Sequence, residues 1–236
     1  MNLETQPRRR ERLSRSERMA DIMRCAGRIL RESEDREGIV ADIAGRLGIV
    51  EGTIYRYFAT KRDLIIRVAE EWYEGMLADY DRELAGITGT KARLRFMIWR
   101  HLTVMHDEPA MCRLVLDELR ADAGYRKTSI YQLNRHYTQR TLAIVKDGIA
   151  SGELRAEVPL TMVRDMIYGG IEHHCWAYLR GEGRFSPARA ADDIVAIVYR
   201  GIAAPEDTSA LSRLEQVADR LEQITQTHTS NREPSC

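Results

Sequence analysis

The chain has 236 residues, in which 36 basic side chains balance 36 acidic ones, and it is long enough for one or two domains with a substantial core. The chain has only three Phe, six Pro and few clusters of β-branched residues, and this composition disfavours a β-sheet protein. No run approaches the ~18 apolar residues of a membrane span, and the polar first residues lack the apolar core of a signal peptide. We therefore expect an all-α, cytoplasmic protein that does not bind a membrane.

Residues 1–13 are predicted to form a flexible basic arm. They are polar and contain four closely spaced arginines, which suit the phosphates or the minor groove of DNA. The basic bias continues into the front of the chain, because residues 1–70 hold 15 Lys and Arg against 12 Asp and Glu. The remainder has the opposite bias. This distribution is typical of a DNA-binding head on a body that need not touch DNA, although a solvated surface explains it nearly as well.

The stretch from Val40 to Phe58 has the pattern of a helix-turn-helix. A capping box at Ser14 predicts one helix before it, which would pack behind the motif. Within the stretch, apolar residues recur at helical spacing, Gly48 interrupts them, and a second apolar set begins at Ile49. Gly48 can adopt the positive φ of a sharp turn. The second helix of such a motif lies in the major groove of DNA; an ordinary corner between two helices is the alternative.

A resemblance to a known family is carried by the run EGTIYRYF at 51–58, followed by Lys61 and Leu64. In these residues the chain resembles the TetR family of bacterial transcriptional regulators, over about residues 14 to 75. The chain departs from the family at Val50 and Glu51, where Ser or Ala and then Lys are common. A glutamate at this position adds repulsion near DNA phosphates.

The resemblance implies a fold and a set of DNA-contacting residues. The fold is all-α, with an N-terminal three-helix DNA-binding domain that contains the helix-turn-helix and a C-terminal helical domain for ligand binding and dimerisation. Phosphates would be held by Tyr55, Tyr57 and Lys61. The residues closest to the bases would be Gly52, Thr53 and Arg56.

The body is predicted to consist of long helices. A helix starting at Lys61 has an apolar stripe of about 25 residues, or ~37 Å, and is long enough to bridge two domains. Beyond Gly89, the apolar spacing predicts helices over about 91–107, 109–121, 125–151, 160–180 and 187–203. We therefore divide the chain into a basic arm (1–13), a DNA-binding domain (14–62), an effector-binding and dimerisation domain (63–205), and an amphipathic helix with a disordered tail (206–236).

The last two helices of the body have more apolar surface than one core face requires. Two such helices from each subunit would form a four-helix interface, and a homodimer also matches a palindromic DNA operator. A fully internal helix pair is the alternative. The residues predicted at the interface are Ile167, Gly170, Ile171, Val195 and Val198.

The body is also rich in Met, Trp, Tyr and His, which suits an adaptable, mostly apolar ligand site with a few polar groups. The candidate effector-binding residues are Trp72, Met97, His101, Met105, Tyr131, His173 and Trp176. The run MIYGGI at 166–171 resembles family members that respond to fatty acids or acyl-CoA. We therefore expect an elongated apolar effector such as a fatty acid or an acyl-CoA, with ordinary core packing as the alternative.

Together these features predict a homodimeric repressor that a small effector releases from its operator by shifting the helix at 61–85. One alternative is a helical nucleic-acid-binding or architectural module without an effector. Another is a helical enzyme that uses His173, His174 and Cys175. Because neighbours on a helix point ~100° apart, these three side chains cannot converge on one metal ion without a partner helix. We expect no catalytic residue, no metal and no cofactor.

Overall fold

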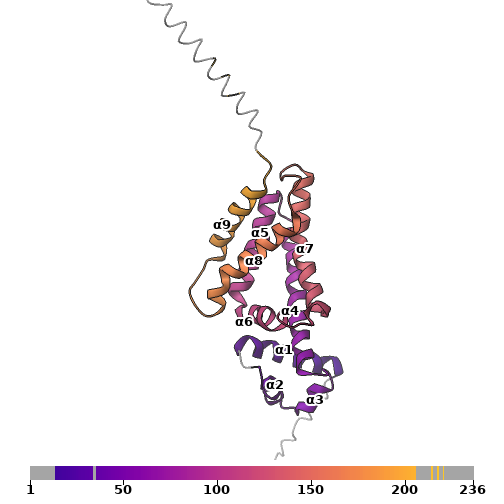
Figure 1. Cartoon of the computed structure of the whole chain (residues 1–236). Coiled ribbons are helices and arrows are strands. Elements are labelled where there is room, and N and C mark those ends of the chain that lie inside the picture. Colours follow the sequence, from indigo (N-terminus) through magenta and orange to yellow (C-terminus); the bar gives the residue numbers. More distant parts are fainter. Residues whose placement is uncertain (1–13, 34–35, 206–213, 215–216, 218–219, 221–236) are drawn as a thin grey trace, which may run out of the picture.

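The computed structural model describes residues 14–33, 36–205 and the single positions 214, 217 and 220. Over these residues the fold is helical and no β-strand forms (Figure 1). The elements are α1 (Arg15–Glu32), α2 (Ile39–Leu47), α3 (Glu51–Tyr55), α4 (Lys61–Leu84), α5 (Thr90–Asp107), α6 (Pro109–Arg113), the π-helix η1 (Leu114–Leu119), the 3-10 helix η2 (Tyr125–Lys127), α7 (Ser129–Ala150), α8 (Leu160–Leu179) and α9 (Pro187–Ile202). The predicted arm at 1–13 and nearly all of the predicted helix and tail at 206–236 lie outside the described residues.

The N-terminal head consists of α1, α2 and α3. The helix α1 begins with the predicted capping box, in which the Ser14 side chain accepts from the Glu17 N–H and the Glu17 carboxylate accepts from the Ser14 N–H. Buried residues of α1, α2 and α3, among them Ile22, Ile43 and Ile54, form the core of this head. The head is therefore held by apolar packing between three short helices rather than by any one of them alone.

The helix α4 joins the head to the body, as Figure 1 shows. It packs on α1 near Val68 and on α7 near Tyr80, so one helix reaches from the head into the body. Thr60 caps its start by accepting from the Asp63 N–H. In the body, α5 lies against α7, α8 and α9 and carries much of the core, including the buried Leu94, Ile98 and Leu102.

Two of the predicted helices are each interrupted in the structure. The segment predicted at 109–121 starts as α6 and continues as the π-helix η1. The segment predicted at 125–151 starts with η2, and α7 begins only at Ser129, because the Thr128 side chain accepts from the Tyr131 N–H and caps it there. The change from α-helical to π-helical hydrogen bonding at Leu114 depends on tertiary packing, and the spacing of apolar residues does not predict it.

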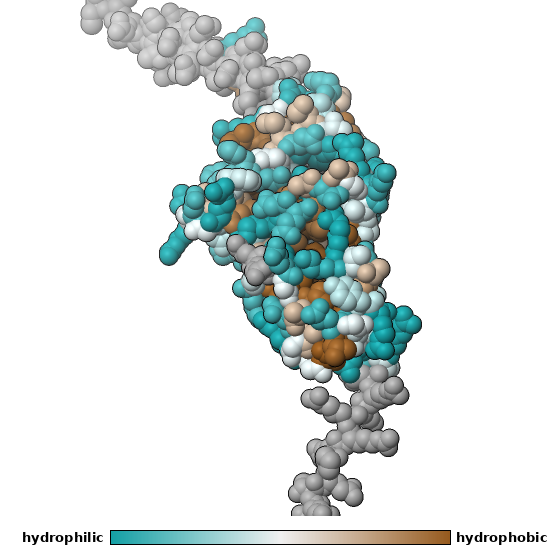
Figure 2. Space-filling view, turned by 60° about the horizontal axis from the view of Figure 1, so that its bottom comes forward, coloured by the Kyte–Doolittle hydropathy of each residue, from teal (hydrophilic) through white to brown (hydrophobic). Residues whose placement is uncertain are grey.

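The surface in Figure 2 is mostly hydrophilic, with apolar groups visible in a recess near the middle of the view. Within the described residues, no helix is both long enough and apolar enough to cross a lipid bilayer.

Candidate functional site

The turn between α2 and α3 is built as the sequence predicts. Gly48 has a φ of 62°, in the left-handed region that other residues rarely adopt, and the Ile49 N–H donates to the Ala44 carbonyl at 3.0 Å. Ile54 is only 1% exposed and anchors α3 on the head. This anchoring turns the opposite side of α3 outward, at the end of the molecule farthest from the body (Figure 1).

The predicted DNA-contacting residues all reach the surface around α3. Gly52, Tyr55 and Arg56 are exposed, whereas Thr53, Tyr57 and Lys61 are partly exposed. Apolar groups are also presented to solvent here, since Val50 is 74% exposed and Tyr55 is 46% exposed. An exposed helix with aromatic, hydroxyl and guanidinium groups at the tip of a small head is suited to contact both bases and phosphates.

Two contacts orient the edge of this surface. The guanidinium of Arg15 lies 5.8 Å from the centre of the Tyr57 ring, so α1 contributes a cation that sequence analysis did not select. The Lys61 Nζ lies 3.4 Å from the carbonyl oxygen of Arg36, to which it donates. The loop before α2 therefore fixes where the Lys61 charge is presented.

A second candidate site is a cavity of about 490 Å³ in the body, bounded by α4, α5, η1, η2, α7 and α8. Among its lining residues, apolar side chains include Met76, Met105, Val115 and Leu116. Its polar lining includes five tyrosines and four arginines: Tyr73, Tyr125, Tyr131, Tyr137, Tyr168, Arg120, Arg126, Arg135 and Arg164. The cavity is thus amphipathic, and its volume lies in the ~300–1,000 Å³ range of small-molecule sites.

Four of the seven predicted effector residues line this cavity, namely Trp72, His101, Met105 and Tyr131. The structure does not bring the other three to it. Met97 is 1% exposed in the core of the body, and His173 and Trp176 lie on the outer surface of α8. The reason is geometric, because the face of α8 that lines the cavity carries Arg164, Tyr168 and Glu172 instead.

The residues that sequence analysis missed are the polar ones. Arg164, Tyr168 and Glu172 are spaced by four, which places them on one face of α8. This four-residue spacing is present in the sequence, but the pattern of Met, Trp, Tyr and His that predicted the site includes neither Arg164 nor Glu172. Arg120 and Tyr125 belong to the irregular segment around η1 and η2, and no periodic signal identifies them.

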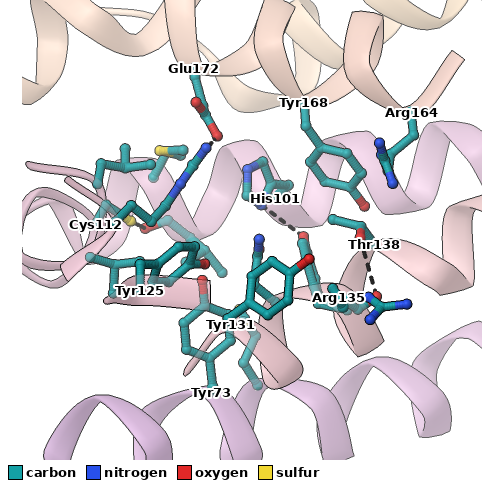
Figure 3. Close-up of a pocket in the computed structure, with 18 of the residues that line it drawn as sticks. Tyr73, His101, Cys112, Tyr125, Tyr131, Arg135, Thr138, Arg164, Tyr168 and Glu172 are labelled. Atoms are coloured by element: carbon teal, nitrogen blue, oxygen red, sulfur yellow. Dashed lines mark hydrogen bonds and ion pairs between the residues drawn. The ribbon is translucent and has the colours of Figure 1, made fainter. Parts of the chain in front are cut away.

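The polar groups of the cavity are connected (Figure 3). The Tyr137 hydroxyl lies 2.8 Å from His101 Nδ1 and 3.3 Å from the Tyr80 hydroxyl, while Tyr168 and Thr141 share a hydroxyl hydrogen bond of 2.8 Å. Burial, and then the nearby charge of Arg120, lower the pKa of His101 to about 4. This imidazole is therefore neutral near pH 7.

An ion pair closes part of the cavity wall. The Arg120 Nη1 donates to Glu172 Oε1 at 2.5 Å and ties the segment after η1 to α8. The two side chains are only about one-third exposed, at 35% and 32%, so the pair is screened less than a fully exposed one.

The segment that lines the cavity also contacts the head. Glu118 of η1 forms an ion pair with Arg36, in the loop before α2. Asp122 Oδ2 lies 3.1 Å from Nη2 of Arg62, at the start of α4. In addition, Arg31 Nε of α1 donates to Glu108 Oε2 at 2.7 Å. The residues between 108 and 127 therefore connect the cavity physically to the helices that carry the exposed α3 surface.

The predicted interface residues are divided between the inside and the outside of the protomer. Ile167, Ile171 and Val195 are at most 3% exposed and belong to the core of the single chain. Gly170 is exposed and Val198 is partly exposed. The large apolar side chains exposed on α8 and α9 are instead Met162, Met166, Trp176 and Ile197, each more than half exposed.

The side chains of the run His173-His174-Cys175 do not converge on one point. The two histidines are exposed, whereas Cys175 is fully buried, and burial raises the pKa of its thiol to about 12. Within the described residues, no three His, Cys, Asp or Glu side chains are grouped so that they could hold a metal ion.

Known proteins resemble both parts of the chain. Residues 38–68 match the family model of bacterial regulatory proteins of the tetR family, and residues 88–202 match the tetracyclin repressor-like C-terminal domain. The chain is 22% identical over 181 residues to the fatty acid metabolism regulator protein of Bacillus subtilis, covering 77% of this chain and 93% of that protein. It is 20% identical over 198 residues to the HTH-type transcriptional repressor KstR2 of Rhodococcus jostii, covering 82% and 95%.

A solved structure shares the fold. The transcriptional regulator FadR from Bacillus subtilis, in complex with stearoyl-CoA, matches with a TM-score of 0.68 at 22% sequence identity. The match covers 78% of this chain and 98% of that one. It extends from the head through the helical body, so the arrangement of both parts is one that experimental structures contain.

Proposed function

This chain belongs to the TetR family of bacterial regulatory proteins, and from that premise we propose that it is a homodimeric, cytoplasmic repressor released from its operator by an acyl-CoA or a closely related acyl compound. The observation that carries the proposal is the shared segment between 108 and 127. It lines the cavity through Val115, Leu116 and Arg120, and it holds the head through Glu118 and Asp122.

We assign DNA recognition to α3 and to the residues that directly precede and follow it. Tyr55, Tyr57 and Lys61 set the position of the head on the phosphates, and Gly52, Thr53 and Arg56 lie closest to the bases. This assignment is supported by the exposure of the α3 surface, because Ile54 alone of its five residues is buried.

We assign dimerisation to the exposed apolar residues of α8 and α9. Met162, Met166, Trp176 and Ile197 leave an apolar surface uncovered in the single chain, and burial of such a surface against a second copy is favourable. The exposed Gly169 and Gly170 on the same helix allow close approach of a partner helix. Two heads related by a two-fold axis would then read a palindromic operator.

The effector class rests on the cavity and on the relatives together. The cavity offers apolar surface for a hydrocarbon body, with tyrosine, histidine and arginine side chains for a polar head. One relative is a regulator of fatty acid metabolism, and the solved relative holds stearoyl-CoA. Both properties match the expected elongated apolar effector.

Release follows from a two-state equilibrium. A ligand shifts the equilibrium only by its differential affinity for the two states. A ~100-fold preference for the DNA-free state is worth ~2.7 kcal/mol, which is enough to empty most operators. The ligand would act by moving the 108–127 segment and the start of α4, which changes the spacing of the two α3 helices in the dimer.

The test is operator binding with and without ligand. DNA from the chain's own promoter region is titrated with the full chain at fixed salt, because affinities for DNA are salt-dependent. We expect sequence-specific binding that acyl-CoAs of increasing chain length weaken, while coenzyme A alone does not. Sequence-independent binding that no ligand changes would favour an architectural module instead. Turnover of an acyl-CoA that a His173→Ala variant loses would favour the enzyme.

A further inference from the structure

One nitrogen in the cavity wall lacks a partner. His101 of α5 uses Nδ1 for its contact with the Tyr137 hydroxyl, while its Nε2 is buried and has no hydrogen-bond partner among the described residues. Buried polar atoms are nearly always paired, so an unpaired one in the wall of a ligand cavity calls for an explanation. Figure 3 shows the imidazole in the middle of the cavity, between Glu172 and Tyr168.

The hydroxyl groups behind His101 determine which nitrogen carries its proton. The Tyr80 hydroxyl is buried, and the Tyr137 hydroxyl is its hydrogen-bonding neighbour at 3.3 Å. In the arrangement in which Tyr80 donates to Tyr137 and Tyr137 donates to His101 Nδ1 at 2.8 Å, both hydroxyl protons are used. The reverse order would leave the buried Tyr80 proton without an acceptor, which is costly. A neutral imidazole that accepts at Nδ1 carries its hydrogen on Nε2.

The cavity therefore presents a neutral N–H donor that needs an acceptor. Arg120 and Glu172 on the wall already neutralise each other, with Arg120 Nη1 2.5 Å from Glu172 Oε1. A neutral carbonyl oxygen at this point needs only the N–H, whereas a ligand carboxylate also needs a cation beside it, such as Arg126 or Arg135 elsewhere on the cavity wall.

We propose that His101 is the specificity-determining residue of the cavity, and that its Nε2–H donates to a neutral carbonyl oxygen of the ligand, the thioester carbonyl in an acyl-CoA. The inference rests on the proposed function in that the ligand occupies this cavity. Tyr137 is a positioning residue because its hydroxyl holds His101 Nδ1, and Tyr80 supports Tyr137 from behind without lining the cavity. His101 thus distinguishes a thioester from a ligand that lacks the carbonyl oxygen.

The first experiment compares tetradecanoyl-CoA with S-tetradecyl-CoA, a thioether that lacks only the carbonyl oxygen. Dissociation constants are measured by calorimetry on the full chain. We expect wild type to prefer the thioester about tenfold, in line with one buried hydrogen bond. His101→Leu should bind both compounds equally, while His101→Gln, which keeps an N–H near the same position, should retain part of the preference. Unchanged operator binding by the ligand-free variants shows that they are folded.

The second experiment reads the tautomer directly from ¹⁵N shifts of the histidine ring in the full-length protein. We expect a neutral ring with the hydrogen on Nε2 at pH 7, and loss of this fixed tautomer in Tyr137→Phe. Hydrogen on Nδ1, or equal affinity of wild type for the thioester and the thioether, overturns the role of His101. If neither CoA compound binds, the acyl-CoA assignment fails. A steroid ketone and its deoxo analogue then replace them, and equal or absent binding of that pair overturns the role of His101 as well.

Discussion

The ion pair between Glu118 and Arg36 is expected to carry part of the coupling between ligand and DNA. Glu118 lies in the π-helix η1, beside residues that line the cavity, and its carboxylate pairs with an Arg36 side chain that is only 11% exposed. The carbonyl of Arg36 in turn accepts from Lys61, a predicted phosphate contact. Replacing Glu118 by Gln keeps the shape of the side chain and removes its charge, so it weakens the link without emptying the space.

The magnitude lies between two limits. Fully exposed ion pairs contribute ~0–1 kcal/mol, and breaking a fully buried pair costs ~3–5 kcal/mol. With Glu118 46% exposed and Arg36 largely buried, we expect the variant to lose about 1 kcal/mol of coupling. A ligand that weakens operator binding ~100-fold in wild type would then weaken it only about 20-fold in Glu118→Gln.

The assay is fluorescence anisotropy of labelled operator, with and without saturating acyl-CoA, at one salt concentration. Ligand affinity of the DNA-free variant should stay within about twofold of wild type, because Glu118 does not line the cavity. The matched control is Asp117→Asn, which removes a charge from an exposed neighbour that has no ion pair to the described part of the head. An undiminished release ratio in Glu118→Gln, or an equal loss in Asp117→Asn, would refute the reasoning.

Four further predictions follow from the same geometry. Lys61→Ala should weaken binding to all DNA sequences alike and reduce the salt slope by about one; an altered sequence preference at an unchanged slope contradicts a phosphate contact. Glu51→Lys should tighten non-specific binding at low salt by removing repulsion from phosphates, and weaker binding in the same titration would show that the side chain faces away from DNA. Met166→Glu should give folded monomers in analytical ultracentrifugation that bind operator poorly, whereas the buried Ile167→Glu should lower the melting temperature; a dimer in Met166→Glu would place the interface elsewhere. Burial lowers the pKa of His101 to about 4, so between pH 4 and the ordinary histidine pKa of 6.5 the unfolded chain binds more protons than the folded one. The free energy of unfolding should therefore rise with pH across this window, and it should rise less in His101→Leu. Equal slopes of stability against pH in urea melts of the two proteins would contradict a buried neutral histidine.

Local chemistry was sufficient to predict the head. Gly48 predicted the left-handed turn, and the structure has it at a φ of 62°. The capping box at Ser14 predicted the start of α1, which begins at Arg15. The resemblance carried by residues 51–58 predicted the TetR family, which the family matches confirm. These signals are strong because each depends on residues within one or two turns of each other.

The sequence predicted the helices of the body but not which face of each helix is buried. The spacing predicted a helix over about 160–180, and α8 runs from Leu160 to Leu179. It did not tell which side of α8 faces inward, because apolar residues occur on more than one side of the helix. Packing against α5 and α7 buries Ile167 and Ile171, and it leaves Met166 and Trp176 outside.

The sequence alone thus determined the position of most helices, the turn after α2 and the family to which the N-terminal head belongs. Only the tertiary structure decided where the cavity lies and how it connects to the head. His101 meets Tyr137 across 36 positions of chain, and Arg31 meets Glu108 across 77. No periodicity reports such pairs, because they depend on how whole helices pack rather than on the residues along any one of them.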